Sequence, residues 1–293
     1  MANQIVEISK NKYLSLQDGF FVVSEDNKPI GKFVIDNLDV IIISGYNVIY
    51  SNTLLVRLAE NNIPVVLCDE KYIPIAILTP MATNHEQAKI FELQIQMKQT
   101  TKNLLWQKIT KHKLLMQAEV LKTLNKEYLM LVECSKRVLS GDTTNKEAEG
   151  ARKYWKTLFG NDFRRDTEMD GINALLNYGY AVLRSIVARC IVGSGLHCAL
   201  GLFHKHPYNA YRLADDLMEP FRPILDLKVY NLWMMGRTEL DVETKKELIG
   251  VFEENVRGSL GLTEYRFCIQ NFVSSLAQFL LGNRNDLEFI RKL

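Results

Sequence analysis

The feature that most constrains this fold is a change of hydrophobic periodicity near residue 80. Before it, β-branched and aromatic residues come in short runs separated by turn residues, as where KYLSLQ and FFVVSE flank Asp18 and Gly19. Such runs predict β-strands joined by tight turns. After Thr79 and Pro80, apolar residues recur at intervals of three and four, which predicts helices. The chain therefore changes once along its length from strands to helices.

A chain of 293 residues exceeds the usual size of one domain, so two domains are expected. We predict an α+β fold in which a small β-rich domain, residues 1–80, precedes a larger all-α domain, residues 81–293. The polar stretch ATNHEQ after Pro80 is the expected linker. One short helix in the first domain should open at Ser51 or Asn52, because both side chains suit an N-cap.

The cysteines and the hydropathy pattern indicate where the protein works. Its five cysteines are scattered and form no C-x-x-C pair, which argues for a reducing compartment and against a structural zinc or disulfide framework. The first ten residues lack the basic-then-apolar pattern of a secretion signal. The uncharged stretch 40–56 contains several polar residues, and Arg184 and Arg189 interrupt the apolar helical segment. Neither stretch is expected to span a bilayer, so we expect a cytoplasmic protein without a membrane partner.

Positive charge is unevenly distributed along the chain. Residues 1–80 hold 6 Lys and Arg against 9 Asp and Glu, whereas residues 81–293 hold 30 against 25. The excess gathers early in the helical part, at Lys89, Lys98, Lys102, Lys108, Lys111 and Lys113. A helix of this kind fits a phosphate backbone, and Lys102 and Lys108 are candidate DNA contacts. A solvated helix face accounts for the same lysines, and charge alone does not choose between the two.

Residues 200–226, LGLFHKHPYNAYRLADDLMEPFRPILD, combine histidines with closely spaced acids. Asp216 and Glu219 are three positions apart, so on a helix they share a face. His204 or His206 could add a nitrogen ligand at the same point. Carboxylate oxygens suit Mg²⁺ or Mn²⁺, and one imidazole tilts the preference toward Mn²⁺. A solvated acidic face with a histidine at its edge remains the alternative.

A second acidic segment, TTNKEAEGARKYW, opens a predicted helix capped by Thr144 or Asn145. Glu147 and Glu149 lie in its first turns, where the helix dipole alone would favour them. Gly150 is unusual, since a glycine inside a helix costs about 1 kcal/mol relative to alanine. A close approach by another backbone or by a phosphate would account for it.

Cations follow this segment within a few turns. Arg152 and Lys153 come directly after the acids, and Arg164 and Arg165 stand before the next helix. All four are candidate phosphate contacts. Pairing of the two later arginines with Asp162, Asp166 or Glu168 is the alternative.

Three ordered motifs then become recognisable: EGARKYW from Glu149, NALLNYGY from Asn173, and LGLFH followed by LADDLMEPFRP. Together they resemble the CRISPR-associated integrases of spacer acquisition, in the form found in type II systems. The resemblance implies a metal triad of Glu149, His204 and Glu219, with Asp216 as a supporting acid and Mg²⁺ or Mn²⁺ as the ion. His204 is preferred to His206 because it ends the L-G-x-x-H pattern. The tyrosines of LNYGY are expected in the core.

The resemblance also implies an activity and partners. Such proteins are endonucleases and integrases that join the 3′-hydroxyl ends of a short DNA duplex, the prespacer, to a CRISPR repeat by transesterification. The β-rich domain should form a homodimer, and two dimers should flank a dimer of the small second Cas protein in a heterohexamer. The type II effector nuclease and a ring-shaped accessory protein are further expected partners. A non-catalytic DNA-bridging scaffold and a general metallo-phosphodiesterase remain alternatives.

Overall fold

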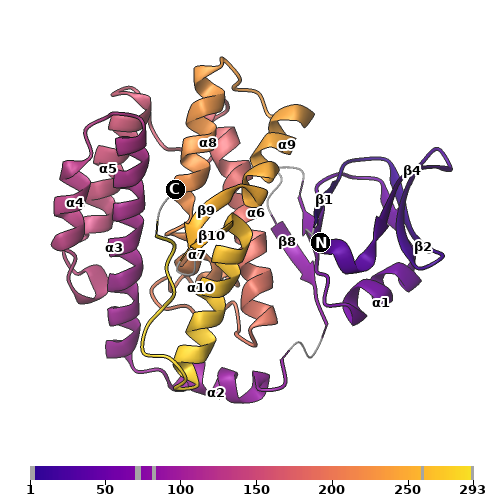
Figure 1. The fold of residues 1–293 in the computed structure, drawn as a ribbon, viewed down its shortest axis with the longest axis horizontal. Helices are drawn as coiled ribbons and strands as arrows, with labels where there is room; N and C mark the ends of the chain where they lie inside the picture. The colour runs from indigo at the N-terminus through magenta and orange to yellow at the C-terminus, as the bar shows by residue number, and fades with distance from the viewer. Residues whose placement is uncertain (1–3, 70–73, 81–83, 259–260, 292–293) are drawn as a thin grey trace. The chain divides into compact units, whose positions relative to one another are not determined.

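The computed structural model describes residues 4–69, 74–80, 84–258 and 261–291. The chain forms two compact units, Met1–His85 and Glu86–Leu293 (Figure 1). Strands dominate the first unit and helices the second, as the change of periodicity near residue 80 predicts.

Two four-stranded sheets build the first unit. In the first sheet the strands follow the order β1 (Gln4–Ile8), β5 (Leu38–Ile43), β7 (Val65–Cys68) and β8 (Pro74–Leu78). Its first three strands are parallel, and β8 is antiparallel to β7. The order in the second sheet is β4 (Lys28–Val34), β3 (Phe20–Glu25), β2 (Lys12–Gln17) and β6 (Val48–Tyr50). The helix α1 (Asn52–Glu60) and the 3-10 turn Ile35–Asn37 complete the unit.

Local chemistry explains these elements. Asp18 and Gly19 both have positive φ, as a two-residue hairpin turn between β2 and β3 requires. Ser51 caps α1 by accepting a hydrogen bond from the backbone N–H of Leu54 at 3.3 Å, which confirms the predicted helix start. Strands β1 and β6 were not predicted: β1 lies in a stretch of mixed polarity, and β6 has only three residues.

Nine α-helices are described in the second unit: α2 (Gln87–Gln96), α3 (Gln99–Thr123), α4 (Leu129–Lys136), α5 (Lys146–Phe159), α6 (Ile172–Gly193), α7 (Arg212–Met218), α8 (Arg222–Met234), α9 (Val242–Gly250) and α10 (Tyr265–Leu280). The 3-10 turns Ser140–Asp142 and Val251–Glu253 lie between them. The long helix α3 packs against α4, α5 and α8, and α6 packs against α7, α8 and α10 (Figure 1). This packing brings α3, α5 and α7 together although they are far apart in sequence.

The second unit is not all-α, so that part of the prediction was wrong. Strands β9 (Asn255–Gly258) and β10 (Gly261–Glu264) form an antiparallel hairpin that packs against α10. Each strand has only four residues, and each has a glycine at the turn end. Such short strands give too few alternating positions for a period of two to be recognised.

Helix α6 is the core helix of this unit. Among the described residues it is the one helix long and apolar enough to cross a membrane, but 72% of its most apolar window is buried by the surrounding helices. Tyr178 and Tyr180 are both buried, which confirms the core position expected for LNYGY.

Candidate metal centre

The loop before α7 is organised around one carboxylate. Asp216, on α7, is fully buried and accepts hydrogen bonds from the backbone N–H groups of Leu202, Phe203 and His204 at 2.6, 3.0 and 3.1 Å. Gly201 permits this winding, because a Cβ there would lie 3.0 Å from Asp216 Oδ2 and 2.8 Å from Cβ of Arg212. The position of His204 in space is therefore fixed by Asp216.

The same carboxylate also holds the imidazole of His204. Nδ1 of His204 lies 2.6 Å from Asp216 Oδ1. This hydrogen bond raises the pKa of His204, while partial burial opposes the rise. A histidine that donates Nδ1–H to a carboxylate presents Nε2 as a metal ligand, a common arrangement behind metal sites. The ring of His204 also lies edge-on to Trp106, at 5.9 Å between centroids.

Glu219 follows α7 and is 4% exposed. Its Oε1 lies 3.1 Å from the guanidinium of Arg222, and its Oε2 lies 2.5 Å from the ammonium of Lys113. Burial raises the pKa of Glu219, but Arg222, Lys113 and His204 outweigh it and leave the pKa lowered. The carboxylate is therefore ionised at neutral pH. Among the described residues, Oε2 accepts no well-oriented hydrogen bond despite its contact with Lys113.

Lys113 joins this carboxylate to helix α5. Its buried ammonium lies 2.6 Å from Glu147 Oε1 as well as 2.5 Å from Glu219 Oε2. Burial lowers the pKa of Lys113, but Glu219 and Glu147 reverse the effect and raise it. Two carboxylates from distant parts of the sequence thus converge on one cationic nitrogen.

Glu149 lies in a different environment. Its carboxylate is 2.6 Å from the ammonium of Lys146 and 2.7 Å from that of Lys153, and it is 3.7 Å from Sγ of Cys134. Hydrogen bonds from the two lysines lower the pKa of Glu149 to about 2. None of the contacts described for Glu149 joins it to His204 or Glu219.

Helical geometry explains why adjacent acids have different partners. At 3.6 residues per turn, Glu147 and Glu149 are separated by about 200° around the helix axis, so only one of them can face α3. The sequence does not choose between them, because Lys113 follows Lys111 and His112 on α3 and is one of several lysines of that helix. The motif EGAR drew attention to Glu149 instead.

The start of α5 also differs from the prediction. Asp142, and not Thr144 or Asn145, caps the helix: its carboxylate accepts from the backbone N–H groups of Lys146 at 2.8 Å and Glu147 at 3.0 Å. Asn145 instead has a left-handed backbone, with φ of 51°. The cap therefore fixes the backbone of Glu147 directly.

Gly150 serves helix packing. A Cβ at this position would lie 2.2 Å from Cδ2 of Leu114 on α3. The close neighbour predicted at Gly150 is thus a side chain, and neither a backbone nor a phosphate is needed to explain it.

The candidate DNA contacts fall into different environments. Lys108 pairs with Asp286 at 2.8 Å, and Lys153 pairs with Glu149. Arg165 donates to the side-chain oxygens of Asn173 and Asn177 at 3.0 and 2.6 Å, which supports a packing role. The remaining three candidates are exposed or half-buried: Arg152, Arg164 and Lys102. A role in DNA binding stays a prediction for all six.

The side chains around Glu219 include donors of the kind that bind divalent ions. No group of three His, Cys, Asp or Glu side chains in the described ranges already surrounds one metal position. Around Lys113, however, two carboxylates share one positive charge, and His204 lies close enough to Glu219 for its charge to act on that carboxylate. Oxygen donors with one imidazole suit Mg²⁺ or Mn²⁺.

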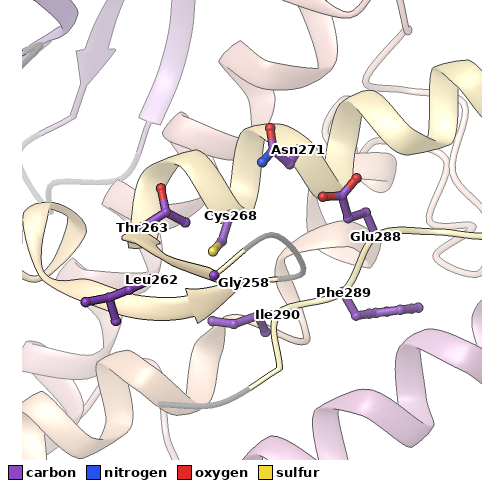
Figure 2. Close-up of a pocket in the computed structure, with 9 residues that line it drawn as sticks. Gly258, Leu262, Thr263, Cys268, Asn271, Glu288, Phe289 and Ile290 are labelled. Atoms are coloured by element: carbon purple, nitrogen blue, oxygen red, sulfur yellow. The ribbon is translucent and has the colours of Figure 1, made fainter.

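A cavity elsewhere offers no comparable chemistry. It has a volume of about 240 Å³ and lies between the β9–β10 hairpin, α10 and the C-terminal segment (Figure 2). Cys268 points toward the hairpin there, and Glu288 and Phe289 line the side formed by the C-terminal segment. Burial, together with the charge of Glu288, raises the pKa of Cys268 to about 11, so its thiol is protonated at neutral pH. A protonated thiol is a poor nucleophile.

Comparison with known proteins identifies the family. The family model described as CRISPR associated protein Cas1 matches residues 6–258. The chain belongs to the Cas1 family. A CRISPR-associated endonuclease Cas1 from Neisseria meningitidis is 40% identical over 219 residues, which cover 73% of this chain and 72% of that protein.

Solved structures agree on the Cas1 fold. A casposase bound to integration product superposes with a TM-score of 0.81 at 20% identity, covering 99% of this chain and 93% of the casposase. A Cas6-RT-Cas1–Cas2 complex contains a chain that superposes with a TM-score of 0.77 at 15% identity, covering all of this chain and 36% of the larger one. The family model and the Neisseria relative confirm the resemblance to this CRISPR-associated family.

Proposed function

We propose that this Cas1 protein is a metal-dependent DNA endonuclease and integrase that inserts short duplex DNA into a CRISPR array. Membership of a family whose curated relative is named an endonuclease supports the enzyme class. The casposase of the same fold was captured with an integration product, which supports strand joining as the reaction. The observation that carries the site is the convergence of Glu147 and Glu219 on one cation beside His204.

The ligand set proposed is Glu147, His204 and Glu219. The sequence prediction placed Glu149 in this set, but Glu147 is the acid of α5 that shares a cation with Glu219. Glu147 and Glu219 would supply oxygens, and His204 would supply Nε2 while Asp216 holds Nδ1. A bound Mg²⁺ or Mn²⁺ would activate the attacking 3′-hydroxyl and stabilise the leaving oxyanion.

The protein's own residues prepare this position. Arg222 contacts Glu219 Oε1 at 3.1 Å and so orients the carboxylate. Tyr154 and Tyr180 donate hydrogen bonds to Asp226, one turn beyond Arg222, and the guanidinium of Arg222 lies over the Tyr180 ring. These contacts restrict movement of the metal-facing carboxylate.

The proposed partners follow from the reaction and the family. The substrates are duplex DNA, both prespacer and CRISPR repeat, and the candidate side chains Arg152, Arg164 and Lys102, which are exposed or half-buried, would contact phosphates. The assembly proposed is a homodimer formed through the β-rich unit, with two dimers flanking a dimer of the second Cas protein. The neighbour solved as a Cas1–Cas2 complex supports that partner. The type II effector nuclease and the ring-shaped accessory protein are proposed as additional partners, and the reaction is placed in the cytoplasm, away from the membrane.

The deciding experiment compares Glu147→Gln with Glu149→Gln. Strand joining is measured with the second Cas protein, a short duplex bearing 3′-hydroxyl ends, a repeat duplex and Mn²⁺. We expect Glu147→Gln to lose joining by on the order of a thousandfold because a metal ligand is removed, and Glu149→Gln to stay within a few-fold of wild type. DNA binding by both variants serves as the control.

Three other outcomes would be informative. Full joining by Glu147→Gln with loss in Glu149→Gln would restore the triad predicted from the sequence. Products that do not depend on Mn²⁺ in any variant would favour a DNA-bridging scaffold. Equal turnover of a small phosphodiester, unaffected by competing duplex DNA, would favour a general phosphodiesterase.

A further inference from the structure

Lys113 occupies the point on which the proposed metal ligands converge. Its ammonium is 2.6 Å from Glu147 Oε1 and 2.5 Å from Glu219 Oε2, so it forms close ion pairs with both carboxylates. The side chain is only 10% exposed, so water does not screen these contacts well. A divalent ion bound through the same two oxygens would have to take over this position.

The four charged side chains of this ion-pair network carry no net charge, and Asp216 pairs separately with His204. Glu147 and Glu219 contribute two negative charges, and Lys113 and Arg222 contribute two positive charges. Two carboxylates facing each other in a buried site without a cation would repel strongly. Adding a divalent ion while Lys113 stays in place would instead leave an excess of two positive charges. Burying such an excess is unfavourable.

We propose that Lys113 is an internal counter-ion that keeps the two carboxylates together in the metal-free protein and competes with the divalent ion for them. This inference rests on the proposed function, because it assumes that Glu147 and Glu219 bind the ion. Metal entry requires the ammonium to leave the two oxygens or the excess positive charge to be offset. The phosphates of bound DNA supply negative charge at the same place, so DNA binding should strengthen metal binding.

Helix packing holds the backbone at Lys113 while its side chain exchanges with the divalent ion. Leu114, the next residue, packs under Gly150 of α5, and Asp142 caps α5 just before Glu147. The backbones of both helices are thereby held, and only the Lys113 side chain has to move. The metal-free and metal-bound forms would differ mainly in one side chain.

The experiment measures Mn²⁺ binding by calorimetry without DNA, in wild type, Lys113→Met and Lys113→Gln. Lys122→Met is the matched control, because Lys122 lies on the same helix and its half-exposed side chain pairs with Glu119. We expect both Lys113 variants to bind Mn²⁺ at least about tenfold more tightly than wild type, since a competing charge is removed. The Lys122 variant should bind as wild type does.

Two further readouts keep the test decisive if a variant folds poorly. Without metal, the Lys113 variants should melt at lower temperature than wild type, because their carboxylates lack a counter-ion, and Mn²⁺ should raise their Tm more than that of wild type. Adding short duplex DNA should tighten Mn²⁺ binding in wild type more than in Lys113→Gln.

The results separate this inference from the function on which it rests. If wild type binds Mn²⁺ and Glu147→Gln does not, but the Lys113 variants bind Mn²⁺ no more tightly than wild type, the counter-ion role is wrong and the metal site stands. If Glu147→Gln binds Mn²⁺ as wild type does, the metal site itself is wrong. If both Lys113 variants bind Mn²⁺ more weakly than wild type, Lys113 does not compete with the ion and instead positions the two carboxylates.

Discussion

Two glutamates only two residues apart on α5 both contact lysines, yet the burial of their partners differs. Glu147 shares the buried ammonium of Lys113 with the buried Glu219, whereas Glu149 contacts Lys146 and Lys153, which are 22% and 41% exposed. The charges of Lys113 and Glu219 must be matched within the protein, while water and salt screen the pairs of Glu149. A contact between a carboxylate and a lysine therefore says little about function until the burial of both partners is known.

The largest loss of stability is expected when the buried Glu219 is replaced. Glu219→Gln leaves Lys113 and Arg222 facing a neutral amide, and removing one partner of buried ion pairs typically costs about 3–5 kcal/mol. We expect a loss of that order in urea unfolding, together with loss of strand joining. Glu149→Gln, the matched variant whose lysine partners are reached by solvent, should unfold nearly as wild type does. Similar unfolding curves for the two variants would mean that burial does not distinguish the two settings.

The second prediction concerns the loop that carries His204. Asp216→Ala removes the acceptor of three backbone N–H groups and of the imidazole. Leaving these donors unsatisfied should destabilise the protein by about 2–4 kcal/mol. The ¹H–¹⁵N signals of the His204 ring should also lose the signature of a hydrogen-bonded Nδ1. Asp215→Ala is the control, because it removes a partner of Arg184 and Asn209 but none of the hydrogen bonds to the backbone of residues 202–204 or to the His204 ring. An unchanged ring signal in Asp216→Ala would contradict the positioning role.

A smaller effect is expected where α5 meets α3. Gly150→Ala adds a Cβ that would lie 2.2 Å from Leu114 Cδ2, and overpacking of this kind costs about 1–3 kcal/mol. Gly193→Ala is the control, because a Cβ there would meet nothing within 4 Å. Thermal unfolding should show a loss for Gly150→Ala that is reduced when Leu114 is also replaced by alanine. A loss of equal size with and without the Leu114 change would place the strain elsewhere.

The last prediction is a dependence of stability on pH and concerns the buried acid Asp226. Burial raises the pKa of Asp226 to about 7, while hydrogen bonds from Tyr180 and Tyr154 oppose the rise. Between about pH 4 and about pH 7 the folded protein therefore retains a proton that the unfolded chain releases, and this group's contribution to stability falls as pH rises. Asp226→Asn does not titrate, so its stability relative to wild type should increase across this window. Urea unfolding at several pH values measures the difference, and a difference independent of pH would contradict the raised pKa.

The sequence predicted the broad fold because the periodicities of strands and helices differ over long stretches. Strands β2 and β3 and the Ser51 cap were found from local residues alone. The hairpin β9–β10 was missed because four-residue strands carry too little pattern. The identity of the cap on α5 depends on Asp142 folding back, which spacing does not reveal.

The candidate site was predictable in part. The contact of His204 with Asp216 joins residues of one segment, and the resemblance named both. The link from Glu147 to Glu219 runs through Lys113 on a third helix, so it depends on tertiary packing that no single segment encodes. Lys113 was interpreted as part of a cationic surface, although its side chain faces inward.

The lack of a Cβ at Gly150 affects which metal ion the proposed site prefers. It sets how closely α5 lies to α3, and Glu147 lies one turn away on the same helix. The distance between the carboxylates of Glu147 and Glu219 therefore depends on the contact between the Gly150 backbone and the Leu114 side chain. Mg²⁺ requires oxygens at about 2.0–2.1 Å and Ca²⁺ at about 2.3–2.6 Å. A methyl group added at Gly150 would push α5 and α3 apart and widen the gap between the two carboxylates. The metal preference of the site would then shift toward ions of larger radius.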